Sequence, residues 1–222
     1  MQNRSIYSSD HELFRENARR FFREELEPNI EQWEKDGIVP KAFWRKAGEN
    51  GFLCCGVPEE YGGPGADFMY NMVLSEETGY AIGGASVGFS VSADIVAYYL
   101  LHAGTEEQKQ KWLPKMVTGE VIASIGMTEP GAGSDLKAIR TSAVRDGDEY
   151  VINGQKTYIT NGQNSDFVLL ACVTDPSKGA RGISMIIVEA DRAGFERGRN
   201  LDKIGQKAAD TSEMFFQDVR VP

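Results

Sequence analysis

The sequence predicts an α+β protein, in which an N-terminal all-α domain is followed by an antiparallel β-barrel or β-sandwich domain. Apolar residues recur at helical spacing through the first 120 residues, and from residue 121 they alternate or form short β-branched runs. The two patterns follow one another instead of alternating, which favours an α+β arrangement over βαβ units. We therefore expect a helical domain over residues 1–120 and a β domain over 121–222.

The helical half contains segments that each carry a start or stop signal. Asp10 is expected to be the N-cap of the first helix, and Pro28 ends or bends it. Thr105 and Gln108 form a capping box that opens the last helix, which runs to about Val117. Glycine and proline bound the segments between them, which are expected at about 30–37, 40–51, 66–80 and 87–102. The apolar stripe of the first helix comprises Leu13, Phe14, Ala18, Phe21 and Phe22.

The β half is expected to consist of short strands joined by tight turns. Asp146-Gly147 lies between apolar runs at 140–144 and 150–152, which predicts a hairpin. Asn153-Gly154 and Asn161-Gly162 are further tight-turn dipeptides. The other strands are expected at 121–127, 167–173, 183–188 and 213–219.

Composition limits the classes of function. The net charge of −9 argues against binding to nucleic acid or to an anionic membrane surface. No run approaches the roughly 18 apolar residues of a membrane span. The cysteines, Cys54, Cys55 and Cys172, are odd in number and two are adjacent, so we expect reduced thiols, as in the cytoplasm. His11 and His102 lack companions at ligand spacing, so no metal site is expected.

Two short runs match known functional motifs in residue type, but the secondary structure expected around them does not match those motifs. The run from Gly131 to Leu136 resembles a dinucleotide-binding glycine loop, but its sixth position is Leu and no βαβ unit surrounds it. The run from Gly84 to Gly88 fits the nucleophile elbow of hydrolases, with Ser86 at its centre, but helices are expected on both sides. We therefore expect neither a Rossmann nucleotide site nor a nucleophilic serine.

The segment 126–135, Gly-Met-Thr-Glu-Pro-Gly-Ala-Gly-Ser-Asp, suits a phosphate-bearing ligand. Its small residues let backbone amides approach a ligand closely, and Thr128 and Ser134 add hydroxyl donors. Further along, Tyr158 and Thr160 offer an aromatic face beside a hydroxyl, which suits a planar heteroaromatic ring. These features predict a phosphate-bearing aromatic ligand. The alternative is a glycine-rich β connection with an aromatic residue in the core.

At every fixed position, the run Gly-Met-Thr-Glu-x-x-Ala-Gly-Ser-Asp-x-x-Ala that ends at Ala138 resembles the signature of acyl-CoA dehydrogenases. Residues 153–162 are similar to the family's second flavin segment, and 214–222 to the end of its β domain. The resemblance spans the whole chain and is nearest to long-chain members, for example at 88–90. It implies an FAD-dependent oxidoreductase of fatty acid β-oxidation, which acts on the CH–CH group of acyl-CoA thioesters and passes a hydride to flavin N5.

The resemblance also implies roles for individual residues. The Thr128 hydroxyl and nearby amides serve the pyrimidine edge of the flavin, and Ser134 lies near the cofactor pyrophosphate and the substrate. Tyr158, where the family often has Trp or Phe, packs against the isoalloxazine, and Thr160 donates toward N5. The implied cofactor-binding residues are Ile125, Gly126, Met127, Thr128, Gly133, Ser134, Tyr158, Ile159 and Thr160, and Ser134 is also implied to bind substrate.

No catalytic residue is expected within the chain. In the family, the glutamate that removes the α-proton comes from a C-terminal helical bundle, which would lie beyond Pro222 and is absent from this chain. Glu129 and Asp135 are expected to have structural roles such as ion pairing and turn capping. We expect these residues alone to bind FAD weakly, not to turn over acyl-CoA, and to associate through the face that the bundle covers.

The implied partners are an acyl-CoA substrate, electron-transfer flavoprotein as electron acceptor and, at full length, further copies in a homo-oligomer. The implied location is the cytoplasm, or the mitochondrial matrix for a eukaryotic protein whose presequence has been removed. Two alternatives are open. One is an acyl-CoA oxidase or two-component flavin monooxygenase on the same scaffold, and the other is a flavin- or acyl-CoA-binding module without catalysis.

Overall fold

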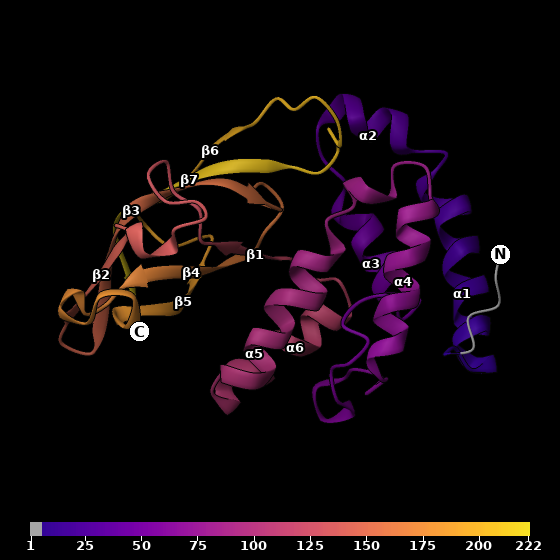
Figure 1. The fold of residues 1–222 in the computed structure, drawn as a ribbon, viewed down its shortest axis with the longest axis horizontal. Helices are drawn as coiled ribbons and strands as arrows, with labels where there is room; N and C mark the ends of the chain where they lie inside the picture. The colour runs from indigo at the N-terminus through magenta and orange to yellow at the C-terminus, as the bar shows by residue number, and fades with distance from the viewer. Residues whose placement is uncertain (1–5) are drawn as a thin grey trace. The chain divides into compact units, whose positions relative to one another are not determined.

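The computed structural model describes residues 6–222 and divides into two compact units. The first comprises the chain through Val121 together with Ile204–Ala209, and the second comprises Ile122–Lys203 and Asp210–Pro222. Helices fill the first unit and strands the second (Figure 1), so the predicted α+β class is confirmed. The first five residues of the expected helical domain lie outside the described residues.

The helical unit follows the predicted segments closely. A π-helical turn, Phe22–Leu26, continues the first helix, and another, Ser90–Val96, precedes the fifth. The predicted end signals hold: Gly37, with φ of 72°, caps α2, and the Thr105 hydroxyl accepts a hydrogen bond from the Gln108 amide at the start of α6. The helices are α1 (Ser9–Phe21), α2 (Ile30–Asp36), α3 (Lys41–Glu49), α4 (Phe68–Tyr80), α5 (Ala97–Ala103) and α6 (Glu106–Val117).

The first helix differs from the prediction at its start and along its buried face. Ser8, not Asp10, is the N-cap, because its hydroxyl accepts from the His11 amide while the His11 ring accepts from the Ser8 amide. Leu13, expected in the core, is 60% exposed, whereas Arg15 is buried. The apolar stripe was wrong at Leu13 because α1 turns a charged face toward α4.

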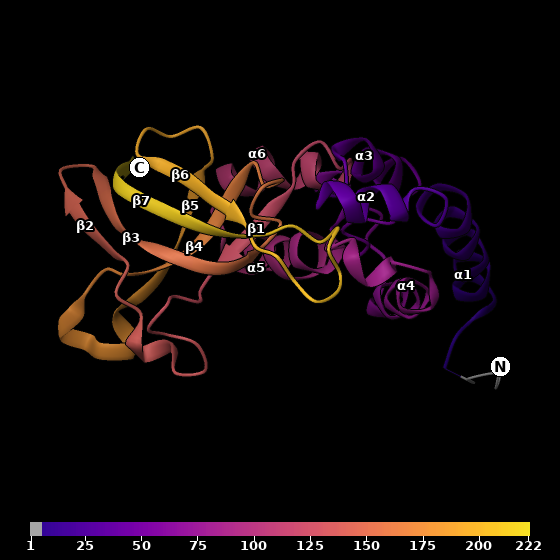
Figure 2. The same ribbon diagram turned by 90° about the horizontal axis from the view of Figure 1, so that it is seen from above.

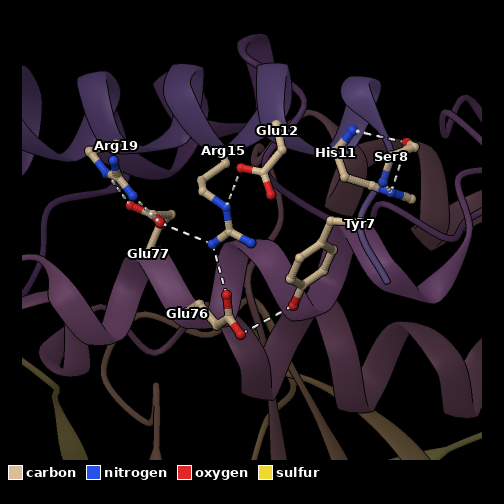
Figure 3. A network of polar contacts seen from close by, with 8 residues as sticks. All are labelled: Tyr7, Ser8, His11, Glu12, Arg15, Arg19, Glu76 and Glu77. Atoms are coloured by element: carbon tan, nitrogen blue, oxygen red, sulfur yellow. Dashed lines mark hydrogen bonds and ion pairs between the residues drawn. The ribbon is translucent and has the colours of Figure 1, made fainter. Parts of the chain in front are cut away.

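An ion-pair network joins α1 to α4, as Figure 3 shows. The Glu77 carboxylate is 1% exposed and accepts from Arg15 Nη1 at 3.1 Å and from Arg19 Nε at 2.7 Å. Arg15 also donates to Glu76 at 2.8 Å, and the Tyr7 hydroxyl donates to the same carboxylate at 3.1 Å. A buried carboxylate is tolerated here because the two guanidinium groups satisfy both of its oxygens.

The structure also places Ser86 and the three cysteines. Ser86 lies in a short 3₁₀ turn, Gly84–Ser86, and donates to Glu34 Oε1 at 3.1 Å, so it is not a nucleophile held above a sheet. The three cysteines are free and buried. Within residues 6–222, no helix is both long and apolar enough to cross a membrane.

The β unit is a single curled sheet (Figures 1 and 2), with seven strands among the described residues. Their order is β1-β4-β2-β3-β7-β6, and β5 pairs with the other edge of β4. The hairpin at Asp146-Gly147 is confirmed. The strands are β1 (Ala123–Gly126), β2 (Ser142–Asp146), β3 (Glu149–Thr160), β4 (Phe167–Val173), β5 (Ile183–Glu189), β6 (Phe195–Asn200) and β7 (Thr211–Val221).

The sheet differs from the expected antiparallel one because it is mixed. β1 and β2 both pair with β4 in parallel. The β2–β3 hairpin separates β1 from β4 in the sequence. Because β1 and β4 are not joined by a tight turn, β4 can lie beside β1 and run in the same direction. The strand β6 was not predicted, because its sequence Phe-Glu-Arg-Gly-Arg-Asn has no apolar alternation and its side chains are mostly exposed at the sheet edge.

Asn153-Gly154 does not form the predicted turn. Both residues lie inside β3, where β7 carries one extra residue opposite them. Asp218, in this extra stretch, has φ of 50°, and its amide donates to the Asn153 side chain at 3.0 Å. The dipeptide therefore lies opposite a β-bulge of β7, and the left-handed backbone of that bulge is at Asp218.

The β unit has a hydrophobic core of its own. Side chains of β2, β3, β4, β5 and β7 form this core, and they are fully or almost fully shielded from solvent. The buried members are Ala143, Ile152, Ile159, Val168, Leu170, Cys172, Val188, Met214, Phe216, Val219 and Val221.

Candidate functional site

The two predicted flavin segments lie next to each other in the β unit. The Thr157 amide donates to the Thr128 carbonyl oxygen at 2.9 Å, and Lys156 Nζ donates to the Met127 carbonyl oxygen at 3.0 Å. One segment follows the end of β1, and the other is the last part of β3. Residues some thirty positions apart therefore form one continuous surface around Thr128 and Tyr158.

The strand β1 delivers the first segment to this surface. It pairs with β4 in parallel, and Ile125 and Met127 are half-buried on either side of Gly126. A Cβ on Gly126 would lie 2.8 Å from Leu170 Cδ1 and 3.1 Å from Val168 Cγ1. Glycine is therefore required at Gly126 by packing inside the unit, a different reason from the close ligand approach inferred from the sequence.

Beyond β1, the chain forms an exposed turn. Glu129 and Ala132 exchange backbone hydrogen bonds of 2.9 and 3.1 Å, while Gly133 and Ser134 are exposed. Within residues 6–222, the amides of Gly133 and Ser134 donate to no other residue. Free amides beside a small hydroxyl residue form a concavity that suits a phosphate or pyrophosphate group. The Asp135 side chain accepts from the Lys137 amide at 3.2 Å, which confirms its turn-capping role.

Tyr158 presents its ring outward from an irregular part of β3. The register of β3 against β7 shifts between Lys156 and Ile159, where β3 carries an extra residue. Tyr158 has φ of 58° and is 69% exposed, whereas Ile159 is buried in the core of the unit. A left-handed backbone at an aromatic residue costs about 1–3 kcal/mol, and such strain is concentrated at ligand sites. Ile159 can reach a ligand only through its backbone.

The turn after β3 is held firmly, which fixes Thr160. As predicted, the chain turns at Asn161-Gly162, and Asn161 has φ of 61°. The Asp210 carboxylate accepts from the amides of Gln163 at 2.6 Å and Asn164 at 3.2 Å. Burial raises the pKa of Asp210, and these amide bonds oppose the shift. The sequence offered no signal for Asp210, which lies some fifty residues from the turn it holds.

The predicted ion pair of Glu129 is confirmed, and its partner is Lys156, which the sequence did not identify. Lys156 Nζ donates to Glu129 Oε1 at 2.8 Å. Burial acts to raise the pKa of Glu129, but hydrogen bonds from Lys156 and from the residues at 140 and 141 outweigh it, so the pKa lies below its usual value. Glu129 is thus an ionised structural residue. The signal that could have found it is the position of Lys156, in phase with the buried Ile152 along β3.

A cavity of the β unit lies beside the turn but not on the predicted flavin surface. Its volume is about 650 Å³, and residues of β3, β6 and β7 line it. Gly131 and Glu129 border it, but none of the nine predicted cofactor residues lines it. Of the predicted residues, Gly133, Ser134 and Tyr158 are exposed, Gly126 and Ile159 are buried, and the other four are half-buried. Among residues 6–222, no group of three or more His, Cys, Asp or Glu side chains is placed to hold a metal.

The donor set of this surface fits a flavin dinucleotide. The ring of Tyr158 suits a flat heteroaromatic system, the free amides of Gly133 and Ser134 suit a pyrophosphate, and the hydroxyls of Thr128 and Thr160 suit the polar edges of a flavin ring. Gly133 also has open space where a Cβ would stand. Of the two carboxylates of the motif, Glu129 is buried, and Asp135 is exposed and accepts a hydrogen bond from the Lys137 amide in its own turn.

Comparison with known proteins agrees with this assignment. Two family models match: "Acyl-CoA dehydrogenase, N-terminal domain" over residues 8–120 and "Acyl-CoA dehydrogenase, middle domain" over residues 124–219. The mitochondrial long-chain specific acyl-CoA dehydrogenase of Mus musculus is 46% identical over 221 residues, which is 99% of this chain and 51% of that protein. The chain spans about half the length of the curated relatives it matches.

Solved structures show the same fold. An acyl-CoA dehydrogenase from Geobacillus kaustophilus is 52% identical with a TM-score of 0.94, covering 98% of this chain and 58% of that one. A glutaryl-CoA dehydrogenase from Mycobacterium smegmatis, in complex with FADH2, is 30% identical with a TM-score of 0.90, covering 100% of this chain and 56% of that one. With both halves of the sequence matched, one by each family model, the chain belongs to the acyl-CoA dehydrogenase family.

Proposed function

We propose that this chain is the flavin-holding part of an FAD-dependent acyl-CoA dehydrogenase, an enzyme that dehydrogenates acyl-CoA thioesters between the α and β carbons. The observation that carries the proposal is the exposed ring of Tyr158, held out by a strained bulge beside a turn with free amides. A large aromatic side chain is kept in a costly backbone conformation only where surrounding structure fixes it, and ligand sites are where this occurs.

Each part of the surface takes one part of the cofactor. The Tyr158 ring packs against the isoalloxazine, the Thr160 hydroxyl donates toward N5, and the Thr128 hydroxyl serves the pyrimidine edge. The exposed turn holds the pyrophosphate, and Ser134 also lies toward the substrate. The proposed cofactor-binding residues are Ile125, Gly126, Met127, Thr128, Gly133, Ser134, Tyr158, Ile159 and Thr160.

When bound, FAD supplies the hydride acceptor for the β carbon of the substrate. The protein must also provide a base for the α-proton, within hydrogen-bond reach of the α carbon. Glu129 is buried and held by Lys156, and the Asp135 carboxylate caps its own turn, so neither acid of the motif is free for this task. We therefore propose that the base is a glutamate outside the two flavin segments.

The proposed substrates and partners follow the family. The 46% identity to a long-chain specific enzyme supports a long-chain acyl-CoA substrate and a role in fatty acid β-oxidation. We propose electron-transfer flavoprotein as the electron acceptor and a homo-oligomer as the working assembly. Three free, buried cysteines suit a reducing compartment, either a cytoplasm or a mitochondrial matrix.

A titration of the purified chain with FAD tests the proposal. We expect saturable binding and a shifted flavin absorption spectrum. Replacing Tyr158 with Ala should remove about 1–3 kcal/mol of stacking, as for a stacked nucleobase, which raises the Kd about 5- to 150-fold. Tyr80→Ala is the matched control, because Tyr80 is equally exposed but lies in the helical unit. Absence of FAD binding, or equal losses in both variants, would contradict the proposal.

A further inference from the structure

Lys156 and Glu129 form an ion pair in the interior of the β unit. The Lys156 side chain is fully buried, and Glu129 is nearly so. Lys156 Nζ lies 2.8 Å from Glu129 Oε1 and 3.0 Å from the Met127 carbonyl oxygen. Lysine and glutamate are almost never fully buried unless they are paired, so this contact is a defined feature of the fold.

The Glu129 carboxylate also holds a third stretch of chain. Its Oε2 accepts from the Arg140 amide at 2.8 Å, and its Oε1 accepts from the Thr141 amide at 3.0 Å. These two residues precede β2. One carboxylate therefore joins the exposed turn, the approach to β2 and, through Lys156, the end of β3.

The neighbours of this pair are the residues assigned to the flavin. Thr128 lies between Met127 and Glu129, both of which bond to Lys156. Tyr158 lies two residues beyond Lys156, and the residue between them, Thr157, donates its amide to the Thr128 carbonyl oxygen at 2.9 Å. A shift of the ion pair would therefore move Thr128 relative to Tyr158.

Stability alone does not explain a pair of charges at this place. Removing two charges from water is costly, and well-packed apolar residues of similar volume are often as stable as a buried ion pair or more so. What an ion pair adds is a unique geometry, because its hydrogen bonds form only when all three stretches are in register. A ligand site whose two halves come from different strands needs that register.

We propose that the Lys156–Glu129 pair positions the flavin site by fixing the register between Thr128 and Tyr158. Both are positioning residues, because neither is placed against the cofactor and each acts through a neighbour. The inference rests on the proposed function, since it takes the segments around Thr128 and Tyr158 to be those that contact FAD.

The test compares Lys156→Met with the double variant Glu129→Gln/Lys156→Met. The single variant leaves a buried carboxylate without its cation and should lose stability, and the double variant should recover most of that loss. FAD affinity should stay about 10- to 100-fold reduced in both, by analogy with the loss of metal affinity when residues that support metal ligands are removed. Lys115→Met, an exposed lysine of the helical unit, is the matched control and should change neither property.

A conservative variant and a measurement without ligand separate a loss of register from a loss of stability. Glu129→Asp keeps both charges but shortens one arm, so it should fold and still lose FAD affinity. Amide exchange at Thr157, measured by NMR without ligand, should accelerate in every pair variant. A stable double variant or Glu129→Asp with wild-type FAD affinity and wild-type Thr157 exchange overturns the inference. If the wild-type chain binds no FAD, the proposed function fails instead, and Thr157 exchange still reports whether the pair sets the register.

Discussion

Substitution of Gly126 by alanine tests whether the first flavin segment is fixed by packing inside the β unit. The new methyl group would lie 2.8 Å from Leu170 Cδ1, whereas carbon atoms pack best at about 3.5–4.0 Å, so one of the two must move by about 0.7 Å or more. Leu170 is fully buried and Val168 Cγ1 is only 3.1 Å away, so packed core side chains must take up the displacement. Overpacking of this kind costs about 1–3 kcal/mol.

Gly133→Ala is the matched control within the same motif. Nothing lies within 4 Å of the position of its Cβ, and its φ is not in the left-handed region. Alanine should therefore be neutral there or stabilise the fold by about 0.4–1 kcal/mol, through the unfolded chain. The same methyl group would project into the space assigned to the cofactor, so FAD affinity should fall without loss of stability.

Hydrogen exchange of β4 peptides as a function of urea concentration measures the effect in the correct unit. Tryptophan fluorescence would not do so, because all three tryptophans lie in the helical unit. We expect the free energy of opening of β4 to fall by about 1–3 kcal/mol in Gly126→Ala and not in Gly133→Ala. Equal stability of the two variants would refute the argument that core packing demands glycine at 126.

Two more predictions concern charged groups. Glu77→Gln should lower the free energy of unfolding of the helical unit by about 3 kcal/mol, because Arg15 then lacks its buried anionic partner. Glu16 is exposed, so Glu16→Gln should change the same free energy by less than about 0.5 kcal/mol. Urea unfolding followed by tryptophan fluorescence measures both, and equal effects would contradict the burial argument. The pKa of Glu129 lies below its ordinary value of 4.5, so its charge stabilises the fold above that pH, and this contribution disappears as the pH falls through the lowered pKa. As the pH falls below about 5, the wild type should therefore lose more stability than Glu129→Gln. Identical dependence of stability on pH in the two proteins would show that folding does not stabilise the charged form of this carboxylate.

Features encoded by a few neighbouring residues were predictable from the sequence. Gly37 ends a helix through its own left-handed backbone, and the Thr105–Gln108 box forms because both partners lie within one turn. The motif 126–135 was equally accessible, because its glycines and hydroxyls are contiguous. In each case, the physical interaction spans at most a few residues of chain.

Features that depend on distant partners were not predictable. Leu13 is exposed because α1 packs against α4 through charged residues. Arg15 is buried there and bonds to Glu77, whereas a hydrophobic pattern would place Leu13 on the buried face. Lys156 could not be paired with Glu129, nor Asp210 with the turn at 163–164, because each contact joins stretches far apart in the chain. The parallel pairing of β1 with β4 is of the same kind, since no local pattern distinguishes the direction of a partner strand.

The bulge in β3 has a consequence for how this strand can be aligned or redesigned. In a regular strand, side chains two positions apart point to the same side, so Tyr158 would follow Lys156 into the interior. The extra residue changes the phase: inward positions are even-numbered up to Lys156 and odd-numbered from Ile159. A single deletion between these residues would restore regular alternation, with one outward position left between Lys156 and Ile159, and deletion of Thr157 would give that position to Tyr158. Deletion of Thr157 should therefore keep an outward ring but remove the left-handed backbone that now holds it, which separates the direction of the ring from the strain of the bulge.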